Sequence, residues 1–304
     1  MQKTSPTRRR LRIGIVSAAA AVAIVAIVAV VVVVSAGTDA PPRPVETVAA
    51  VAPSPSQSPP PPAAPAQPSQ QQLAALPLAF YDAVIPQLLD SSMTTPVNRW
   101  EIAAPKDPLV ALYSSPAPDA APIAALGATV LTVNTPTAVA VFGVSGDMIL
   151  VSTPSRRTVP SPGIPAPSST FAWARAADFT LTTVDRSVIV DNTTSTVSIV
   201  SASGAVSASE VARLGTPDDP TPAATFTYIE SSYIDTRVAY TRGNPISLTG
   251  AHSATLAGYG GNSALTALHF YPDPTGKSHG CVRVSAAMTH ALAALPAGTP
   301  IIFT

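Results

Sequence analysis

The sequence predicts a mainly β protein, and three features of the chain support that class. Apolar runs of about four to eight residues recur after position 100 and alternate with clusters of Pro, Gly, Asn and Ser. The chain contains 34 prolines, which disfavour long helices. The few segments with a helical pattern are short. The 304 residues are enough for two modest folded domains and a tail.

Residues 73–182 predict a short helix followed by a small β domain. Apolar residues have helical spacing over 73–89, but Pro77 and Pro86 limit this helix to a short or broken one. Ser145-Gly146-Asp147 predicts a hairpin turn, and residues 156–169 form a Pro- and Ser-rich loop. The expected strands are 109–113, 128–133, 138–144, 148–152 and 171–174. Residues 112–116, 146–151 and 172–175 resemble bacterial wall-associated barrels of the Src-homology type, and a spacer domain without a ligand is the alternative.

Residues 185–304 predict a second, mostly β domain. Phe226, Tyr228 and Ile234 are the expected inward positions of a strand over 224–234. Ser285 is a good N-cap for a helix that ends near Leu295. The other expected elements are a hairpin over 187–192 and 195–201, helical turns over 251–257, a strand from 260 to 269 and a closing strand over 300–303.

The N-terminal segment predicts a membrane anchor. Residues 1–12 contain five of the 17 basic residues and no acid, and residues 13–36 carry no charge. This uncharged run reaches the ~20 residues that a helix needs to cross a bilayer. The basic cluster before it predicts a cytoplasmic N-terminus and an extracytoplasmic C-terminal part. A signal peptide cleaved after Val34-Ser35-Ala36 is the alternative.

A linker and an acidic remainder follow the predicted anchor. Residues 37–72 are rich in Pro, Ala, Ser and Gln and predict an extended, semi-rigid linker. Beyond position 12 the chain has 12 basic and 17 acidic residues, a net charge of −5. Because no basic patch stands out, we expect no nucleic-acid partner.

The chemistry-bearing motif is Ser278-His279-Gly280-Cys281-Val282-Arg283. Cys281 is the only cysteine, so it has no partner for an intramolecular disulfide. His269 or His279 can serve as the base that a nucleophilic thiol needs. The N–H groups of Gly280 and Cys281 are candidate oxyanion donors, and Arg283 can bind a substrate carboxylate.

The residue types alone leave two other interpretations open. A lone cysteine is often a small buried apolar side chain. His269, His279, Cys281 and Asp273 could instead hold a metal ion such as zinc, although their spacing matches no familiar zinc finger.

The cysteine motif resembles the signature of the L,D-transpeptidases, whose YkuD-like catalytic domain contains a Ser/Thr-His-Gly-Cys run followed by an apolar residue and Arg or Asn. Residues 188–191 and 197–200 resemble the opening hairpin of that domain, and residues 216–227 resemble its Thr-Pro segment. Gly260-Gly261 and the strand to His269 resemble the strand that carries the first histidine of the family. The resemblance covers about residues 185–304 and implies a β-sandwich catalytic domain.

The resemblance implies acyl transfer on peptidoglycan stem peptides. Cys281 would be the nucleophile and His269 its base, with His279 and Gly280 shaping the site. Ser278, Tyr259 and Arg283 would contact substrate. It implies that no metal or organic cofactor is needed and that carbapenems acylate Cys281. We expect a monomer that the N-terminal segment anchors in the plasma membrane, with its C-terminal domains facing the cell wall. An L,D-carboxypeptidase and an inactive wall-binding protein are the alternatives.

Two positions depart from the family pattern. His269 and His279 are separated by nine residues, fewer than the family usually has. Phe270 follows His269, where the family often has Gly or Ser. We expect His252 and His290 to have structural or surface positions.

Overall fold

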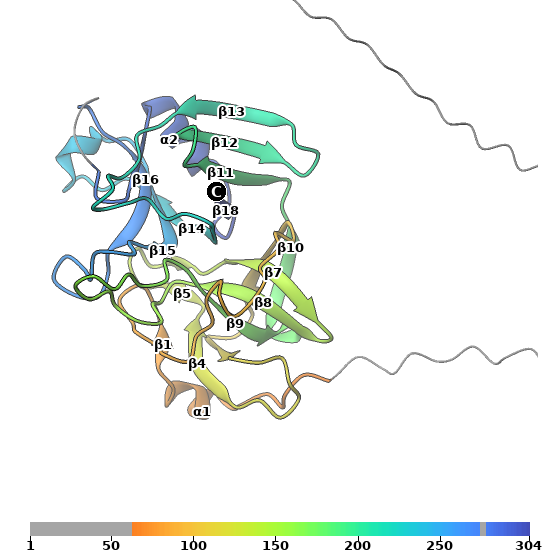
Figure 1. The fold of residues 1–304 in the computed structure, drawn as a ribbon. Helices are drawn as coiled ribbons and strands as arrows, with labels where there is room; N and C mark the ends of the chain where they lie inside the picture. The colour runs from red at the N-terminus through yellow and green to blue at the C-terminus, as the bar shows by residue number, and fades with distance from the viewer. Residues whose placement is uncertain (1–62, 274–277) are drawn as a thin grey trace, which may run out of the picture. The chain divides into compact units, whose positions relative to one another are not determined.

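The computed structural model describes residues 63–273 and 278–304, and Figure 1 shows their course. The chain divides into two units, residues 1–57 and 58–304, and all the described residues belong to the second. The predicted segments 1–12 and 13–36 lie outside the described residues, as does most of the predicted linker. Among the residues described, no helix is both long and apolar enough to cross a membrane.

The first sheet has eight strands in the order β1-β4-β3-β9-β8-β7-β2-β10. The central strand β8 is buried along its whole length, and the core around it contains Leu112, Phe142 and Phe171. The short helix α1 (Gln70–Ala74) precedes the sheet, and β5 (Thr129–Val130) pairs with β6 (Thr135–Pro136) beside it. The strands of the sheet are β1 (Leu78–Ala79), β2 (Glu101–Pro105), β3 (Leu109–Tyr113), β4 (Pro122–Gly127), β7 (Val139–Ser145), β8 (Met148–Thr153), β9 (Thr170–Arg175) and β10 (Phe179–Thr183).

The strands predicted with the strongest apolar patterns are confirmed as β3, β7, β8 and β9. The helix predicted over 73–89 is wrong in extent, because α1 ends at Ala74 and Pro77 lies before β1. Pro77 has no N–H to continue a helix, and its carbonyl instead accepts from Ala125 N at 2.9 Å. The strand expected over 128–133 is only the two-residue β5.

The second sheet has eight strands in the order β13-β12-β11-β18-β14-β15-β16-β17. Its core includes Val188, Ile229, Leu268, Val282 and Phe303. The helix α2 (Ala286–Ala293) begins where the N-cap was predicted, and Ser285 Oγ accepts from Met288 N. The strands are β11 (Arg186–Asp191), β12 (Thr196–Ser201), β13 (Val206–Val211), β14 (Thr225–Tyr233), β15 (Ile246–His252), β16 (Leu265–Phe270), β17 (Val282–Val284) and β18 (Pro300–Phe303).

Two predictions in the second sheet are wrong. The helical turns expected over 251–257 are absent, because β15 continues to His252 and the chain then turns at Ser253, whose Oγ accepts from Leu256 N. Ile234 is 55% exposed instead of inward, because β14 ends at Tyr233. The hairpin over 187–201, the strand over 224–234 and the closing strand are confirmed as β11–β12, β14 and β18. The structure therefore bears out the mainly β class.

Strand β14 brings the two sheets together. Phe226 and Tyr228 pack on the core of the first sheet, whereas Ile229 belongs to the core of the second. The rings of Phe142 and Phe226 lie edge to face with centroids 5.5 Å apart. A Cβ atom at Gly250 would lie 2.3 Å from the Tyr228 ring, so β15 needs glycine there. Figure 1 accordingly shows β14 and β15 on the side of the second sheet that faces the first.

Candidate active site

The predicted nucleophile and base lie on neighbouring strands of the second sheet. Cys281 immediately precedes β17, which pairs in parallel with β16 so that Leu268 is opposite Val282 and His269 is opposite Arg283. Leu268 and Val282 are fully buried in the core. Because side chains alternate along a strand, His269, Cys281 and Arg283 project from the opposite face. The fold thus brings base and thiol together on one face.

The imidazole of His269 has a fixed orientation. Its Nδ1 lies 2.8 Å from the carbonyl oxygen of Phe270. Since a carbonyl can only accept, Nδ1 carries the proton in the neutral ring and Nε2 is left as the acceptor. Burial lowers the pKa of His269, and the charge of Arg283 lowers it further. The neutral, proton-accepting ring is therefore the resting form. The phenylalanine departs from the family pattern without disturbing this contact, because the backbone alone makes it.

Cys281 is half-buried, and its Sγ lies 4.0 Å from the carbonyl oxygen of Leu265 on β16. Burial raises the pKa of the thiol, while a backbone hydrogen bond with Ala267 and the charge of Arg283 act in the opposite direction. The resting pair is therefore a neutral thiol beside a neutral imidazole. This arrangement suits general-base activation, in which the thiol loses its proton as it attacks.

The turn that presents the thiol is fixed by hydrogen bonds. Gly280 has φ +96°, which a side chain would strain, and a Cβ there would lie 3.1 Å from the carbonyl oxygen of Pro220. Thr221 Oγ1 donates to the carbonyl of Gly280 at 3.0 Å. The buried Ser278 donates its hydroxyl to the carbonyl of Cys281 at 2.5 Å. The structure thus places Ser278 in the turn, where its hydroxyl proton already has a partner.

His279 projects away from the core and pairs with an acid that the sequence analysis did not single out. Its Nδ1 lies 2.7 Å from Asp219 Oδ2, and 65% of its side chain is exposed. Asp219 also accepts from Thr255 Oγ1 at 3.4 Å. His279 therefore connects the cysteine turn to two loops of the sheet. The role of His279 in shaping the site and the role of His269 as the base stay predictions.

Aromatic side chains surround the pair. The ring of Tyr240 lies 5.5 Å from that of His269 and 5.2 Å from that of Tyr271, between centroids. The Arg283 guanidinium stacks 3.8 Å above the Tyr271 ring. Tyr259 is 69% exposed, and its pKa is raised first by desolvation and then by its proximity to the ionisable groups of Cys281 and Asp219. The charge of Arg283 lowers the pKa of the Cys281 thiol, and the pKa of Tyr259 responds to Cys281, so both side chains are near the cysteine. Their contact with substrate stays a prediction.

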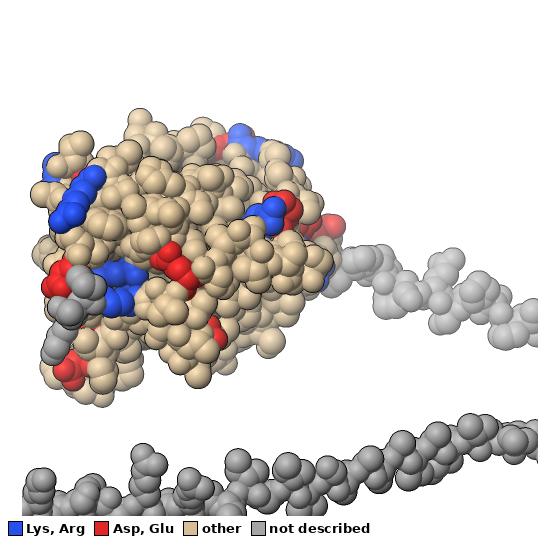
Figure 2. Space-filling model, turned by 90° about the horizontal axis from the view of Figure 1, so that it is seen from above, with Lys and Arg blue, Asp and Glu red and all other residues tan. Residues whose placement is uncertain are grey.

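Several charged groups elsewhere form local ion pairs. Figure 2 shows Lys and Arg in small separate groups with Asp and Glu close by, on a largely uncharged surface. Arg157–Asp90 at 3.2 Å and Arg237–Asp235 at 2.8 Å are examples. Among residues 63–273 and 278–304, no three of His, Cys, Asp and Glu are placed to hold a metal ion.

Residues 185–303 match the family model of YkuD, the L,D-transpeptidase catalytic domain. This part of the chain is a YkuD domain. It contains Cys281, His269 and the other predicted site residues. A search of the curated proteins gave no match.

Solved structures similar to this chain include three L,D-transpeptidases. The one from Stackebrandtia nassauensis is 19% identical, with 40% of this chain and 55% of that chain covered and a TM-score of 0.28. The Enterococcus faecium C442S mutant is also 19% identical, with 40% and 53% covered and a TM-score of 0.28. The Mycobacterium smegmatis enzyme is 16% identical, with 52% and 90% covered and a TM-score of 0.29. The chain therefore spans about half the length of the first two.

The loop between β15 and β16, which carries Tyr259, is bound together with the end of β15 to the segments that follow β1 and β8. Asp82 Oδ1 accepts from the backbone N–H of Asn262 at 2.6 Å. His252 Nε2 lies 2.8 Å from the carbonyl oxygen of Tyr81. The buried Arg156 donates from Nη2 to the carbonyls of Ser253 and Leu256, at 3.1 and 2.8 Å respectively. We call these contacts the loop clamp.

The sequence analysis missed Asp219, Tyr240, Asp82 and Arg156. The contacts of Asp82 and Arg156 join positions 97 to 180 residues apart, so no local pattern could indicate them. His252, expected to be structural, is buried in the clamp, and burial lowers its pKa to about 4. Asp219 could have been noticed, because it lies inside the Thr-Pro segment that resembles the family.

Proposed function

We propose that this protein is a peptidoglycan L,D-transpeptidase that works through a cysteine acyl-enzyme. The placement of His269 and Cys281 on one face of β16 and β17 carries the proposal. The match of residues 185–303 to the L,D-transpeptidase catalytic domain gives the reaction class. We assign each residue its part in the chemistry on the basis of these two observations.

In the first half-reaction, Cys281 Sγ attacks the carbonyl carbon of the third stem residue. Nε2 of His269 takes the thiol proton, since Nδ1 is committed to the Phe270 carbonyl. Backbone N–H groups at Gly280 and Cys281 stabilise the oxyanion, and the leaving D-alanine amine receives the proton. This leaves a thioester on Cys281.

In the second half-reaction, the side-chain amine of another stem attacks the thioester carbonyl and gives its proton to His269. The thiol reforms, and the product is a bond between the third residues of two stems. Arg283, already stacked on Tyr271 beside the thiol, is placed to attract a substrate carboxylate. Tyr259, mostly exposed at the same face, supplies an aromatic wall for the stem peptide.

We also propose that residues 13–36 anchor the protein as a single membrane-spanning helix. Residues 37–72 would then carry the folded unit away from the plasma membrane towards the cell wall. The uncharged run after a basic cluster supports this proposal. A monomer is sufficient for the reaction, because His269 and Cys281 belong to the same chain.

Product analysis tests the proposed reaction. The full chain is incubated with tetrapeptide stems, and the products are identified by mass spectrometry beside Cys281→Ala and the matched control His290→Ala, whose residue is exposed on α2. We expect stem dimers from the wild type and from His290→Ala, and none from Cys281→Ala. Release of D-alanine without dimers would make water the acceptor, and dimers from Cys281→Ala would contradict the proposal.

A further inference from the structure

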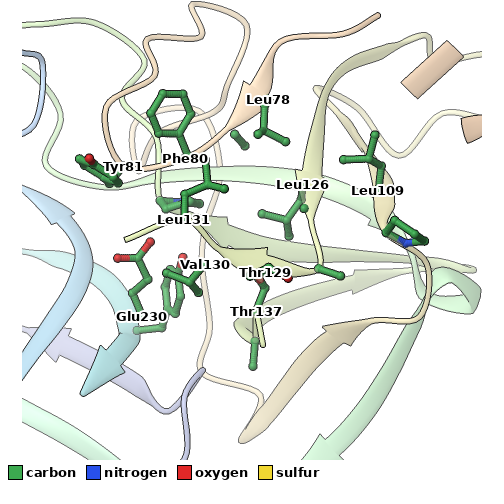
Figure 3. Close-up of a pocket in the computed structure, with 17 residues that line it drawn as sticks. Leu78, Phe80, Tyr81, Leu109, Leu126, Thr129, Val130, Leu131, Thr137 and Glu230 are labelled. Carbon is green, nitrogen blue, oxygen red and sulfur yellow. The ribbon is translucent and has the colours of Figure 1, made fainter. Parts of the chain in front are cut away.

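A cavity of about 260 Å³ lies between the first sheet and β14, away from the cysteine. Figure 3 shows its wall of apolar side chains, with the carboxyl group of Glu230 on the same side as Tyr81 and Leu131. The wall is contributed mainly by β1 and the two residues that follow it, by β3–β5 and by β14. Its apolar members include Leu78, Phe80, Leu126, Val130 and Leu131. Neither Cys281 nor His269 belongs to the lining.

Glu230 enters this cavity through an irregularity in β14. Ile229 is opposite Thr249 and Ser231 is opposite Leu248, so Glu230 is the extra residue of a β-bulge. A β-bulge changes the direction of a side chain relative to a regular strand. This bulge directs the carboxyl group of Glu230 into the cavity. Tyr228, two residues earlier, faces the same core of the first sheet.

The carboxyl group of Glu230 lacks a compensating partner within the described part of the chain. The residue is 4% exposed, and its Oε2 is buried without a hydrogen bond. No Lys, Arg or His lines the cavity with it. Burial raises the pKa of Glu230 to about 7, and the phenols that respond to its charge are those of Tyr228 and Tyr233. A buried acid without a cation is costly, and a bound cation would remove that cost.

We propose that this cavity binds a small apolar amine whose ammonium group pairs with the Glu230 carboxylate. The hydrocarbon part of the ligand would fill the space between Leu126 and Leu131. A cavity of about 150 Å³ already accepts benzene, so this one has room for a ring or a branched chain with an attached amine. The Glu230 carboxylate favours a ligand with an ammonium group over one with a carboxylate. The apolar wall favours a hydrocarbon over a sugar, whose hydroxyl groups would lose hydrogen bonds to water. The site is separate from the acyl-transfer face.

Calorimetric titration of the full chain with cyclohexylmethylamine, beside the alcohol cyclohexylmethanol, tests the proposal. At about pH 8 we expect the amine to bind, and its affinity to fall about tenfold or more in Glu230→Gln, because a charge-assisted contact is lost. The alcohol should bind more weakly and should not distinguish the two proteins. Amine affinity should also fall at about pH 5.5, where the carboxyl group is protonated.

Two controls keep the result interpretable. Glu230→Gln must still be acylated at Cys281 by a carbapenem, which shows that it is folded independently of the cavity. Leu131→Trp, which adds volume at the exposed edge of the cavity, should also lower amine affinity. Equal amine affinity in the wild type and in Glu230→Gln, or no binding to the folded wild type at millimolar amine, would overturn the proposal.

Discussion

The face of the second sheet around Cys281 differs from the contact between the two sheets in how its polar groups are hydrogen-bonded. Around the thiol, His269 contacts the Phe270 carbonyl and His279 pairs with Asp219. Between the sheets, Glu230 Oε2 and two nitrogens of Arg156 are buried without hydrogen-bond partners among the described residues. The first region is therefore arranged before any substrate arrives, as the proposed acyl transfer would require. The second is where pH and ligands should change stability.

The largest expected effect comes from removing the base on the arranged face. His269→Gln should slow acylation of Cys281 by a carbapenem by about 10²–10⁴-fold, because Nε2 no longer accepts the thiol proton. Stopped-flow or mass-resolved time courses measure this rate. The matched control is His290→Gln, on the exposed side of α2. Equal rates in the two variants would remove His269 from the mechanism.

The contact between the sheets should make stability fall as pH rises. Glu230 has a folded pKa of about 7 against an ordinary value of 4.5, so the folded state binds the proton more tightly. Its contribution is complete below pH 4.5 and is lost as pH rises to about 7. The difference between the folded pKa and the ordinary pKa corresponds to about 3 kcal/mol of unfolding free energy.

Glu230→Gln should remove this loss of stability with rising pH. Denaturant unfolding of both proteins from about pH 5 to about pH 8 should show a difference that grows with pH in favour of the variant. His252, with its pKa lowered to about 4, acts in the opposite direction and destabilises below its ordinary pKa of 6.5 in both proteins. A difference that does not change with pH would mean that Glu230 is already paired.

A smaller effect should follow from opening the loop clamp. Asp82→Ala removes the acceptor of the Asn262 N–H and should cost about 1–2 kcal/mol of unfolding free energy. The loop that carries Tyr259 would then be held less firmly. Because Tyr259 would be less well positioned for the substrate, acylation of Cys281 should slow about threefold to tenfold. Asp185→Ala, where the side chain is 86% exposed, is the control. Normal acylation kinetics in a destabilised Asp82→Ala would show that the loop clamp does not affect the reaction at Cys281.

The smallest effect is expected at the exposed ion pair. Asp219→Asn weakens the contact with His279, whose side chain is 65% exposed, so the loss of stability should stay below about 1 kcal/mol. Thermal unfolding and acylation rates measure both consequences. A loss of acylation as large as that of His269→Gln would place Asp219 in the acyl-transfer machinery and erase the distinction between the two histidines.

The sequence predicted those parts of the molecule whose signals are local. Apolar runs identified β3, β8 and β14, and Ser285 identified the start of α2, because packing and capping act over a few residues. The edge strand β13 was missed because Val206–Val211 is polar and mostly exposed. The cysteine motif and His269 were found from a short pattern. Asp82, Arg156 and Glu230 were not, because their environments arise only when distant segments pack together.

The most direct test of the central claim is intact-mass spectrometry of the full chain after exposure to a carbapenem. The account predicts one covalent adduct on the wild type, no adduct on Cys281→Ala, and a rate that keeps its neutral-pH value until His269 becomes protonated below its ordinary pKa of 6.5. No adduct on a folded wild-type protein, or an adduct that persists in Cys281→Ala, would contradict it.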